Sequence, residues 1–174
     1  MSRVVLLLRG INVGGVKVPM AELKACLEEA GFRDVETVFN TGNVVCTPPA
    51  GDQVELSEVS LSARFGYSAK VLSLSPDELR RCATEFPWQD VPETSHRYVV
   101  FGDSDELLDE LVEVGQPSPT ERLARGPKCL YWVVPKGDTL GTDLSKLFAK
   151  PRYKKSTTTR NMNTVEKLVE LCKS

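Results

Sequence analysis

A glycine-rich turn near the amino terminus carries the residue types that bind anions. The turn reads Arg9-Gly10-Ile11-Asn12-Val13-Gly14-Gly15 and directly follows the apolar run at residues 4–8. Backbone N–H groups in such a turn can point together at an anion, and an arginine can add a bidentate grip on a phosphate. The alternative interpretation is a tight turn in which the glycines only supply positive φ angles. The predicted ligand-binding residues of this turn are Arg9, Gly10, Asn12, Gly14 and Gly15.

The second candidate site is the polar segment Ser156-Thr157-Thr158-Thr159-Arg160-Asn161-Met162-Asn163. We expect it to be a loop that leads into a final helix, and a helix N-terminus beside cations attracts phosphate or carboxylate. Two alternatives need no ligand. Asn163, three residues before Glu166, fits a helix-capping pair, and threonines in loops bond to their own backbone. The predicted ligand-binding residues are Thr157, Thr158, Thr159, Arg160 and Asn161, together with Asn43 from an earlier turn.

Charge is distributed unevenly along the chain, although the formal net charge is only −2. Residues 103–113 contain six acids and no base, and their helical spacing indicates a solvated helix face. Residues 144–165 contain six bases and no acid. Because uncompensated cations repel one another, the second block favours an anion site. The net charge nevertheless argues against a wholly basic nucleic-acid binder.

The arrangement of nucleophiles, bases and metal ligands indicates no reaction. The spacing of Gly10 and Gly15 is close to that of a P-loop, but Val16 and Lys17 stand where that motif requires Lys and then Ser or Thr. His96 is the single histidine, so any Ser-His or Cys-His pair must use it, and we expect it at the surface or half-buried rather than in catalysis. We therefore predict no catalytic residue, no metal site and no cofactor, and an enzyme is the less favoured class.

The cysteines and the apolar runs predict the cellular location of the protein. The five cysteines are an odd number without a C-x-x-C pair, which argues against a disulfide framework and a structural zinc site. The apolar run at residues 4–8 is too short for a signal peptide or a membrane span. The sequence therefore predicts a reduced, cytoplasmic protein without a membrane partner.

The elements that must position these residues follow from apolar periodicity and turn signals. In the first half we expect strands at residues 4–8, 35–39, 44–47 and 69–74. We expect one helix at 19–31 and a second that follows the break at residues 48–51 and ends at about residue 65. In the second half we expect a helix from Ser75, strands at 97–101, 121–124 and 129–134, and helices around 107–112, 142–150 and 165–172. The first half is then β-α-β-β-α-β, and the second half repeats β-α-β-β-α.

This order predicts the fold class and the domain organisation. We expect an α+β fold of two ferredoxin-like β-α-β-β-α-β-type modules with mostly antiparallel sheets. The modules are predicted at residues 1–74 and 75–174, packed as one body.

Four segments together resemble one bacterial family, the domain-of-unknown-function 1697 family. They lie at residues 9–15, 18–23, 41–45 and 159–165, in the family's order and spread over nearly the whole chain. The resemblance implies an α+β protein with two related lobes, and no activity is established for the family. It marks the first glycine loop, the Gly42-Asn43 turn and Arg160-Asn161 as signature positions. Met162 stands where the family usually has a tryptophan, and Cys46 where an aromatic residue is common.

Three functions remain open, in order of preference. The first is binding of a phosphate-bearing small molecule or a nucleic-acid backbone, in a pocket formed by the turn at residues 9–15, Asn43 and the segment 157–161. The second is a hydrolase or transferase that acts on such a ligand. The third is a structural or partner-binding protein in which these motifs hold the two lobes together.

Overall fold

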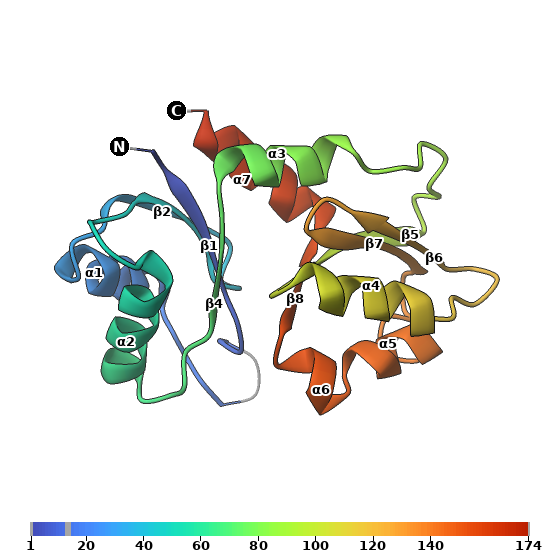
Figure 1. Cartoon of the computed structure of the whole chain (residues 1–174), viewed down its shortest axis with the longest axis horizontal. Helices are drawn as coiled ribbons and strands as arrows, with labels where there is room; N and C mark the ends of the chain where they lie inside the picture. Colours follow the sequence, from blue (N-terminus) through green and yellow to red (C-terminus); the bar gives the residue numbers. More distant parts are fainter. Residues whose placement is uncertain (1, 13–14, 174) are drawn as a thin grey trace. The chain divides into compact units, whose positions relative to one another are not determined.

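The structure, a computed structural model, describes residues 2–12 and 15–173 and contains two four-stranded antiparallel sheets, each flanked by helices (Figure 1). The order β-α-β-β-α-β occurs twice, with a further helix after each repeat and a pair of helices at the second helical position of the second repeat. The first repeat comprises β1 (Val4–Leu8), α1 (Met20–Glu29), β2 (Arg33–Val38), β3 (Asn43–Thr47), α2 (Gln53–Phe65), β4 (Val71–Leu74) and α3 (Pro76–Thr84). The second comprises β5 (Ser95–Gly102), α4 (Asp105–Val114), β6 (Arg122–Gly126), β7 (Cys129–Pro135), α5 (Asp143–Phe148), α6 (Pro151–Lys154), β8 (Thr157–Asn161) and α7 (Met162–Cys172).

Continuous apolar sequence makes β1 a buried central strand of the first sheet. All five of its residues are buried, as expected for a strand covered on both faces. β1 pairs with β3 on one side and β4 on the other, so the strand order is β2-β3-β1-β4. Leu6 and Leu8 alternate onto one core together with Leu23 of α1 and Leu61 of α2. The expected β-α-β-β-α-β order of the first half is confirmed.

The second sheet has the same topology, with the strand order β6-β7-β5-β8. Its strands are again all antiparallel. Val100 and Leu130 point from the strands into a core that contains Leu108 and Leu111 of α4 and Leu144 of α5. The prediction of two ferredoxin-like modules with antiparallel sheets is therefore confirmed.

The basic segment departs most from the expected loop. It forms α6 and then β8, which pairs with β5 and completes the second sheet. The buried strand β5 needs hydrogen-bonding partners on both sides, and three consecutive β-branched residues, Thr157 to Thr159, suit a strand. The prediction of a loop was wrong because the high charge of the preceding residues suggested a solvated segment.

The last helix belongs to two parts of the chain. The contacts divide the chain into compact units: the first is Met1–Leu79 with Glu166–Ser174, and the second is Arg80–Val165. α7 therefore begins in the second unit and continues in the first, where Nη1 of Arg3 donates to the carbonyl oxygen of Leu171 at 2.9 Å. The predicted modules at 1–74 and 75–174 differ from this division mainly at the carboxyl end. An amphipathic helix packs against whichever part of the protein can bury its apolar face, and that part need not be its neighbour in the sequence.

Two buried residues, the cysteines and the length of the helices complete the description of the fold. Cys46 and Met162 are both buried, so each packs as a core residue. All five cysteines are free thiols. No helix within the described residues combines the length and the apolar character needed to cross a bilayer.

Candidate functional site

The described part of the glycine-rich turn is held together by Asn12. The backbone of Asn12 has a φ of 55°, and its N–H donates to the carbonyl of Val16 at 2.6 Å. Its side-chain Nδ2 donates to the carbonyls of Val18 and Asn40, at 3.0 and 2.6 Å, while Oδ1 accepts from the N–H of Val18 at 2.8 Å. Both ends of this amide are therefore used to close the loop and tie it to the neighbouring turn. Of the predicted site residues, Gly14 lies outside the described residues.

Asn43 has an equivalent role in the turn between β2 and β3. Its side chain is fully buried, and Nδ2 donates to the carbonyl of Val38 at 2.9 Å and to Oγ1 of Thr41 at 2.7 Å. A ligand in solvent cannot reach a side chain at this depth. Asn43, which we predicted to bind the ligand, therefore uses its side chain to stabilise the turn.

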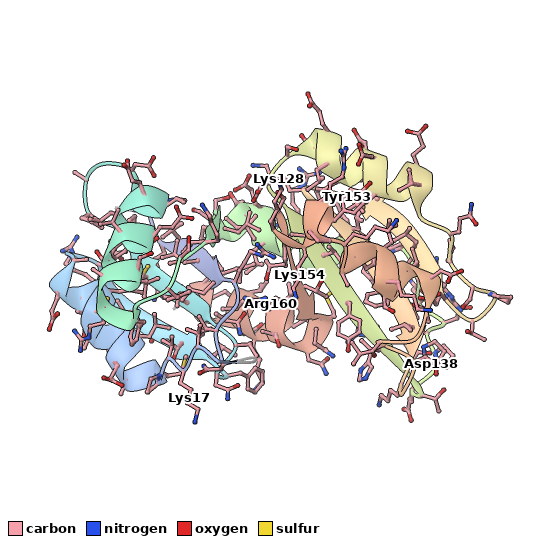
Figure 2. All side chains as sticks on the ribbon, turned by 90° about the horizontal axis from the view of Figure 1, so that it is seen from below. Lys17, Lys128, Asp138, Tyr153, Lys154 and Arg160 are labelled. Carbon is pink, nitrogen blue, oxygen red and sulfur yellow. The ribbon has the colours of Figure 1, made fainter. Side chains whose placement is uncertain are left out.

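An open pocket of about 390 Å³ lies beside the glycine-rich turn, in the first unit. We name it the Lys17 pocket; its lining is Asn12, Gly15, Val16, Lys17, Val18, Pro19, Met20 and Asn40. Lys17 is the charged residue among these, and Figure 2 shows it projecting outward from the ribbon. Arg9 is half-buried and stands outside this lining. The turn thus supplies one cation and mostly apolar walls, which is a weak arrangement for an anion.

The polar side chains of β8 mostly satisfy one another or the neighbouring backbone. Oγ1 of Thr157 donates to the carbonyl of Tyr153 at 3.0 Å, and Oγ1 of Thr158 accepts from Nη1 of Arg160 at 2.5 Å. Arg160 is only 8% exposed, and Nη1 also donates to the carbonyl of Thr159 at 3.1 Å. Thr157, Thr158 and Arg160, all predicted to bind the ligand, are buried and act in the structure of β8.

The start of α7 is capped by Asn161. Its Oδ1 accepts from the N–H of Asn163 at 2.9 Å, and α7 begins at the residue between them, Met162. The prediction that Asn163 is the cap was therefore wrong by two positions. This shift places the side chain of Asn163 in the first turn of the helix, where it meets a residue from β5.

A polar pocket of about 550 Å³ lies in the second unit at the start of α7. We name it the Arg97 pocket, and its lining is Val91, Pro92, Glu93, Ser95, His96, Arg97, Lys136, Asn161 and Asn163. The register of the sheet brings these together, because Ser95 pairs with Pro135 and Tyr98 pairs with Asn161. The beginning of β5, the end of β7 and the end of β8 therefore meet at one edge.

The donors of the Arg97 pocket are held in place by neighbouring groups. Nη2 of Arg97 donates to Oδ1 of Asn163 at 3.1 Å, and the guanidinium lies 5.8 Å from the ring centroid of Phe86. The backbone N–H of Lys136 donates to the carbonyl of Thr94 at 2.8 Å, which ties the end of β7 to the segment before β5. An arginine, a lysine and a histidine thus share this pocket with one carboxylate, that of Glu93.

Arg97 and Lys136 were not among the residues predicted to form a site, and His96 was expected to lie at the surface or half-buried. None of the three belongs to a motif. His96 and Arg97 lie on β5 and Lys136 directly follows β7, and the pairing of these two strands is not visible in the sequence. The usable signal was indirect: the expected strand at 97–101 and the expected hairpin strand at 129–134 had to be adjacent in a ferredoxin-like sheet. Asn161 is the one predicted site residue that lines the Arg97 pocket.

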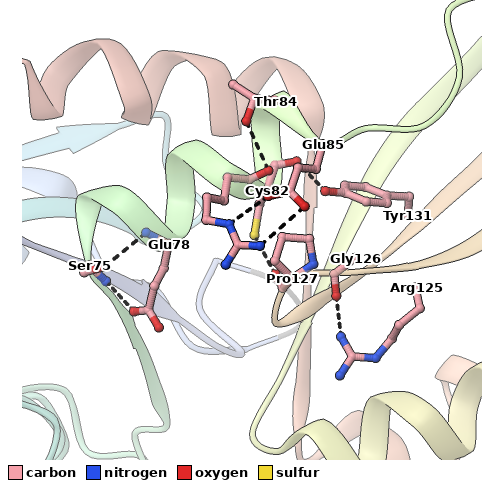
Figure 3. A network of polar contacts seen from close by, with 10 residues as sticks. Ser75, Glu78, Cys82, Thr84, Glu85, Arg125, Gly126, Pro127 and Tyr131 are labelled. Carbon is pink, nitrogen blue, oxygen red and sulfur yellow. Dashed lines mark hydrogen bonds and ion pairs between the residues drawn. The ribbon is translucent and has the colours of Figure 1, made fainter.

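The first unit contains a topologically equivalent pocket with a different charge. The Arg3 pocket, of about 430 Å³, lies where β1 begins, β3 has ended and α3 begins. Here Oε1 of Glu78 accepts from the N–H of Ser75 at 2.9 Å, and Oγ of Ser75 accepts from the N–H of Glu78 at 3.1 Å (Figure 3). Arg3 donates to the carbonyl of Asp34 at 3.0 Å and faces Glu36 at 3.4 Å. The cationic lining of the Arg97 pocket is therefore not a consequence of topology alone.

The acidic and basic blocks of the sequence partly neutralise each other. Nη2 and Nε of Arg152 on α6 donate to Glu110 on α4, at 2.5 and 3.1 Å, and the hydroxyl of Tyr153 donates to the same carboxylate at 2.6 Å. These bonds, that from Tyr153 first, lower the pKa of Glu110. Arg125 similarly binds Asp105 and Asp109. The interpretation of the basic block as uncompensated is thus wrong for Arg152.

The described residues offer no cluster of three or more His, Cys, Asp or Glu side chains that could hold a metal ion. The Arg97 pocket supplies hydrogen-bond donors and positive charges from Arg97 and Lys136.

Comparison with known proteins gives a family and a fold. Residues 1–131 match the family described as a protein of unknown function, DUF1697. The structure is similar to that of the conserved bacterial protein SP0830 from Streptococcus pneumoniae, with 27% sequence identity, a TM-score of 0.82, and coverage of 100% of this chain and 99% of the other. No curated protein matches the chain. Three of the four family-like segments lie inside the matched residues, and the chain belongs to the DUF1697 family.

Proposed function

We propose that the protein binds a phosphate-bearing small molecule in the Arg97 pocket. The observation that carries the proposal is the convergence of Arg97, Lys136 and His96 on one polar pocket at the first turn of α7. A concave pocket of about 550 Å³ suits a small ligand, because small-molecule sites are clefts that enclose most of the ligand. A nucleic-acid backbone is the less favoured source of the phosphate, because the chain carries a net charge of −2.

The fixed position of Arg97 supports binding of a phosphate group. Its bond to Asn163 and its place over Phe86 restrict the guanidinium before any ligand arrives, so less conformational entropy is lost on binding. Charge-assisted hydrogen bonds from arginine and lysine to phosphate are the strong ones, and the backbone N–H groups at the start of α7 add a favourable dipole. The free state of all five cysteines supports a reducing cytoplasm as the place of binding.

A second candidate function is a hydrolase or transferase acting on the same ligand. His96, the single histidine, lines the Arg97 pocket and is the residue type most often used as a general acid or base. Binding remains the first proposal because it needs only the donors already gathered there. The third alternative, a purely structural role, is supported for Asn12, Asn43 and Thr157, whose side chains bond to the chain itself.

Thermal unfolding in the presence of phosphate compounds tests the proposal. Inorganic phosphate, pyrophosphate, sugar phosphates and nucleotides are added one at a time to the full chain. A ligand at about 100 times its Kd should raise Tm by about 5 °C, because it binds the folded state alone. His96→Ala, tested with the best ligand, separates binding from turnover. If the wild type forms a product from this ligand and the variant does not, the result supports the hydrolase or transferase function.

Two single substitutions localise the binding. Lys136→Ala should weaken binding about tenfold, the value of one charge-assisted hydrogen bond. Lys17→Ala removes an equally exposed lysine from the Lys17 pocket and should leave affinity unchanged. Equal weakening by both variants, or no stabilisation by any phosphate compound, contradicts the proposal.

A further inference from the structure

Two buried cysteines meet beneath the turn between β6 and β7, within the second unit. Cys82 lies on α3 and Cys129 begins β7, and both are 0% exposed. Sγ of Cys82 donates to the carbonyl of Pro127 at 3.1 Å (Figure 3). A Cβ atom built on Gly126 would lie 2.9 Å from Sγ of Cys129. Both sulfur atoms therefore border the same two-residue turn.

The pair shares a set of hydrogen bonds with Tyr131. The hydroxyl of Tyr131 donates to the carbonyl of Cys82 at 2.7 Å, and the side chains of Cys82 and Tyr131 both contact the sulfur of Cys129. These contacts, that with Cys82 first, lower the pKa of Cys129 although burial opposes the shift. By contrast, burial raises the pKa of Cys46 to about 12 and also raises that of Cys172.

The turn beside the pair contains an exposed residue. Lys128 is exposed and adopts a φ of 58°, while Gly126 and Pro127 are half-buried. Hairpin tips open locally far more often than the whole domain unfolds. A small, uncharged oxidant can therefore enter when this tip opens, whereas Cys46 lies in the middle of a sheet.

We propose that Cys82 and Cys129 are a redox pair that closes to an intramolecular disulfide when hydrogen peroxide oxidises the protein. The Cys129 thiolate attacks one peroxide oxygen, the O–O bond breaks, and the departing oxygen leaves as water after taking up a proton. The resulting sulfenic acid on Cys129 is then attacked by the sulfur of Cys82, which loses its proton as a second water leaves. Two thiols are oxidised and the peroxide is reduced to two water molecules.

The disulfide changes how one part of the second unit is held. It replaces the contact between the Cys82 thiol and the Pro127 carbonyl with a covalent link from α3 to β7. Formation requires the two sulfur atoms to approach to about 2 Å. A low-molecular-weight thiol reverses the reaction by thiol–disulfide exchange.

Peptide mapping of the oxidised full chain tests the proposal. The protein is treated with hydrogen peroxide, unfolded in the presence of an alkylating agent and digested. The expected product is one linked peptide pair containing Cys82 and Cys129, lighter by two hydrogen atoms, with Cys26, Cys46 and Cys172 alkylated. The pair should separate again on reduction. Retention of all five thiols, or random pairing that includes Cys26 or Cys46, overturns the proposal.

Three variants show whether the geometry directs the reaction. Cys46→Ser removes a buried thiol from the first unit and should leave the yield of the Cys82–Cys129 link unchanged. Cys129→Ser should abolish the link. Tyr131→Phe keeps both thiols but removes a hydroxyl whose contact helps to lower the pKa of Cys129, so the link should form several-fold more slowly. An unchanged rate in Tyr131→Phe, with circular dichroism equal to that of the wild type, counts against the assigned role of this hydroxyl and hence against the pair as an activated one.

Discussion

Single side chains in the loops decide the local backbone of this protein. Asn12 uses both ends of its amide to close the first loop. The fully buried side chain of Asn43 donates to the carbonyl of Val38 and so stabilises the next turn. Neither residue is needed as a ligand contact to explain why it stands there. A satisfied buried amide contributes about 1 kcal/mol per hydrogen bond and costs more than that when a partner is removed.

Gly42 should be the least replaceable residue of these loops. Its φ is +85°, and an added Cβ would lie 2.7 Å from Cβ of Leu8 and 3.0 Å from Cδ1 of Ile11. Gly42→Ala should therefore lower the free energy of unfolding by about 3 kcal/mol, through backbone strain and overpacking together. Urea unfolding of the full chain measures this.

Gly51 provides the matched control for that substitution. Its φ is also positive, +104°, but an added Cβ would have no neighbour within 4 Å. Gly51→Ala should cost only about 1 kcal/mol, for the backbone alone. Equal losses in the two variants would show that packing against Leu8 and Ile11 contributes nothing.

At the scale of elements, the contact between α4 and α6 explains the two charge blocks of the sequence. Glu110 on α4 receives bonds from Tyr153 and Arg152 of α6, and the bond from Tyr153 is the main reason that its pKa is lowered. A carboxyl group whose pKa is lower in the folded state stabilises that state at neutral pH. This stabilisation is lost as the pH falls from the ordinary value of 4.5 through the lower value of the folded protein.

Glu110→Gln should therefore be less sensitive to acid than the wild type. The difference in unfolding free energy between the two proteins should stay constant above about pH 5 and shrink as the pH falls below 4.5. Tyr153→Phe should change the curve in the same direction, because it removes the main cause of the shift. Urea unfolding at a series of pH values gives the curves, and parallel curves for wild type and Glu110→Gln would contradict this assignment.

At the scale of the whole molecule, the chain repeats one topology and gives the repeats different surfaces. Equivalent positions at the start of β1 and of β5 carry the Arg3 pocket and the Arg97 pocket. A carboxylate occupies the helix start in the first, and cations predominate in the second. The proposed binding function thus rests on side chains and not on the fold itself, which hosts many unrelated functions.

The last helix should stabilise the first unit although it lies at the far end of the sequence. A chain that stops at Val165 loses the bond between Arg3 and Leu171, the contact of Lys167 with the ring of Phe39, and the buried side chain of Leu168. Amide hydrogens of β1 should then exchange at least about tenfold faster, equivalent to a loss of about 1.4 kcal/mol in local stability.

Hydrogen exchange followed by mass spectrometry measures this effect strand by strand. The amides of β7 serve as the internal reference, because β7 lies in the second unit and pairs with β5 and β6. Unchanged exchange in β1 after the truncation would contradict the assignment of residues 166–174 to the first unit.

The sequence by itself determined the order of the elements and the two antiparallel modules. Local signals are enough for this: the apolar run of β1, the turn around Gly42 and the hairpin at Gly126 and Pro127 depend on neighbours in the chain. The β8 strand was not predicted because the segment becomes a strand by pairing with one edge of β5, which is far away in the sequence.

Only the tertiary structure decided which polar residues are available to a ligand. The motifs richest in polar residues lie around Asn12, Asn43 and Arg160. Their side chains form hydrogen bonds with other groups of the chain itself. The Arg97 pocket instead combines ordinary residues from the ends of three strands and the start of a helix. Strand register brings them together, and register follows from long-range pairing, which the residue types at each single position do not encode.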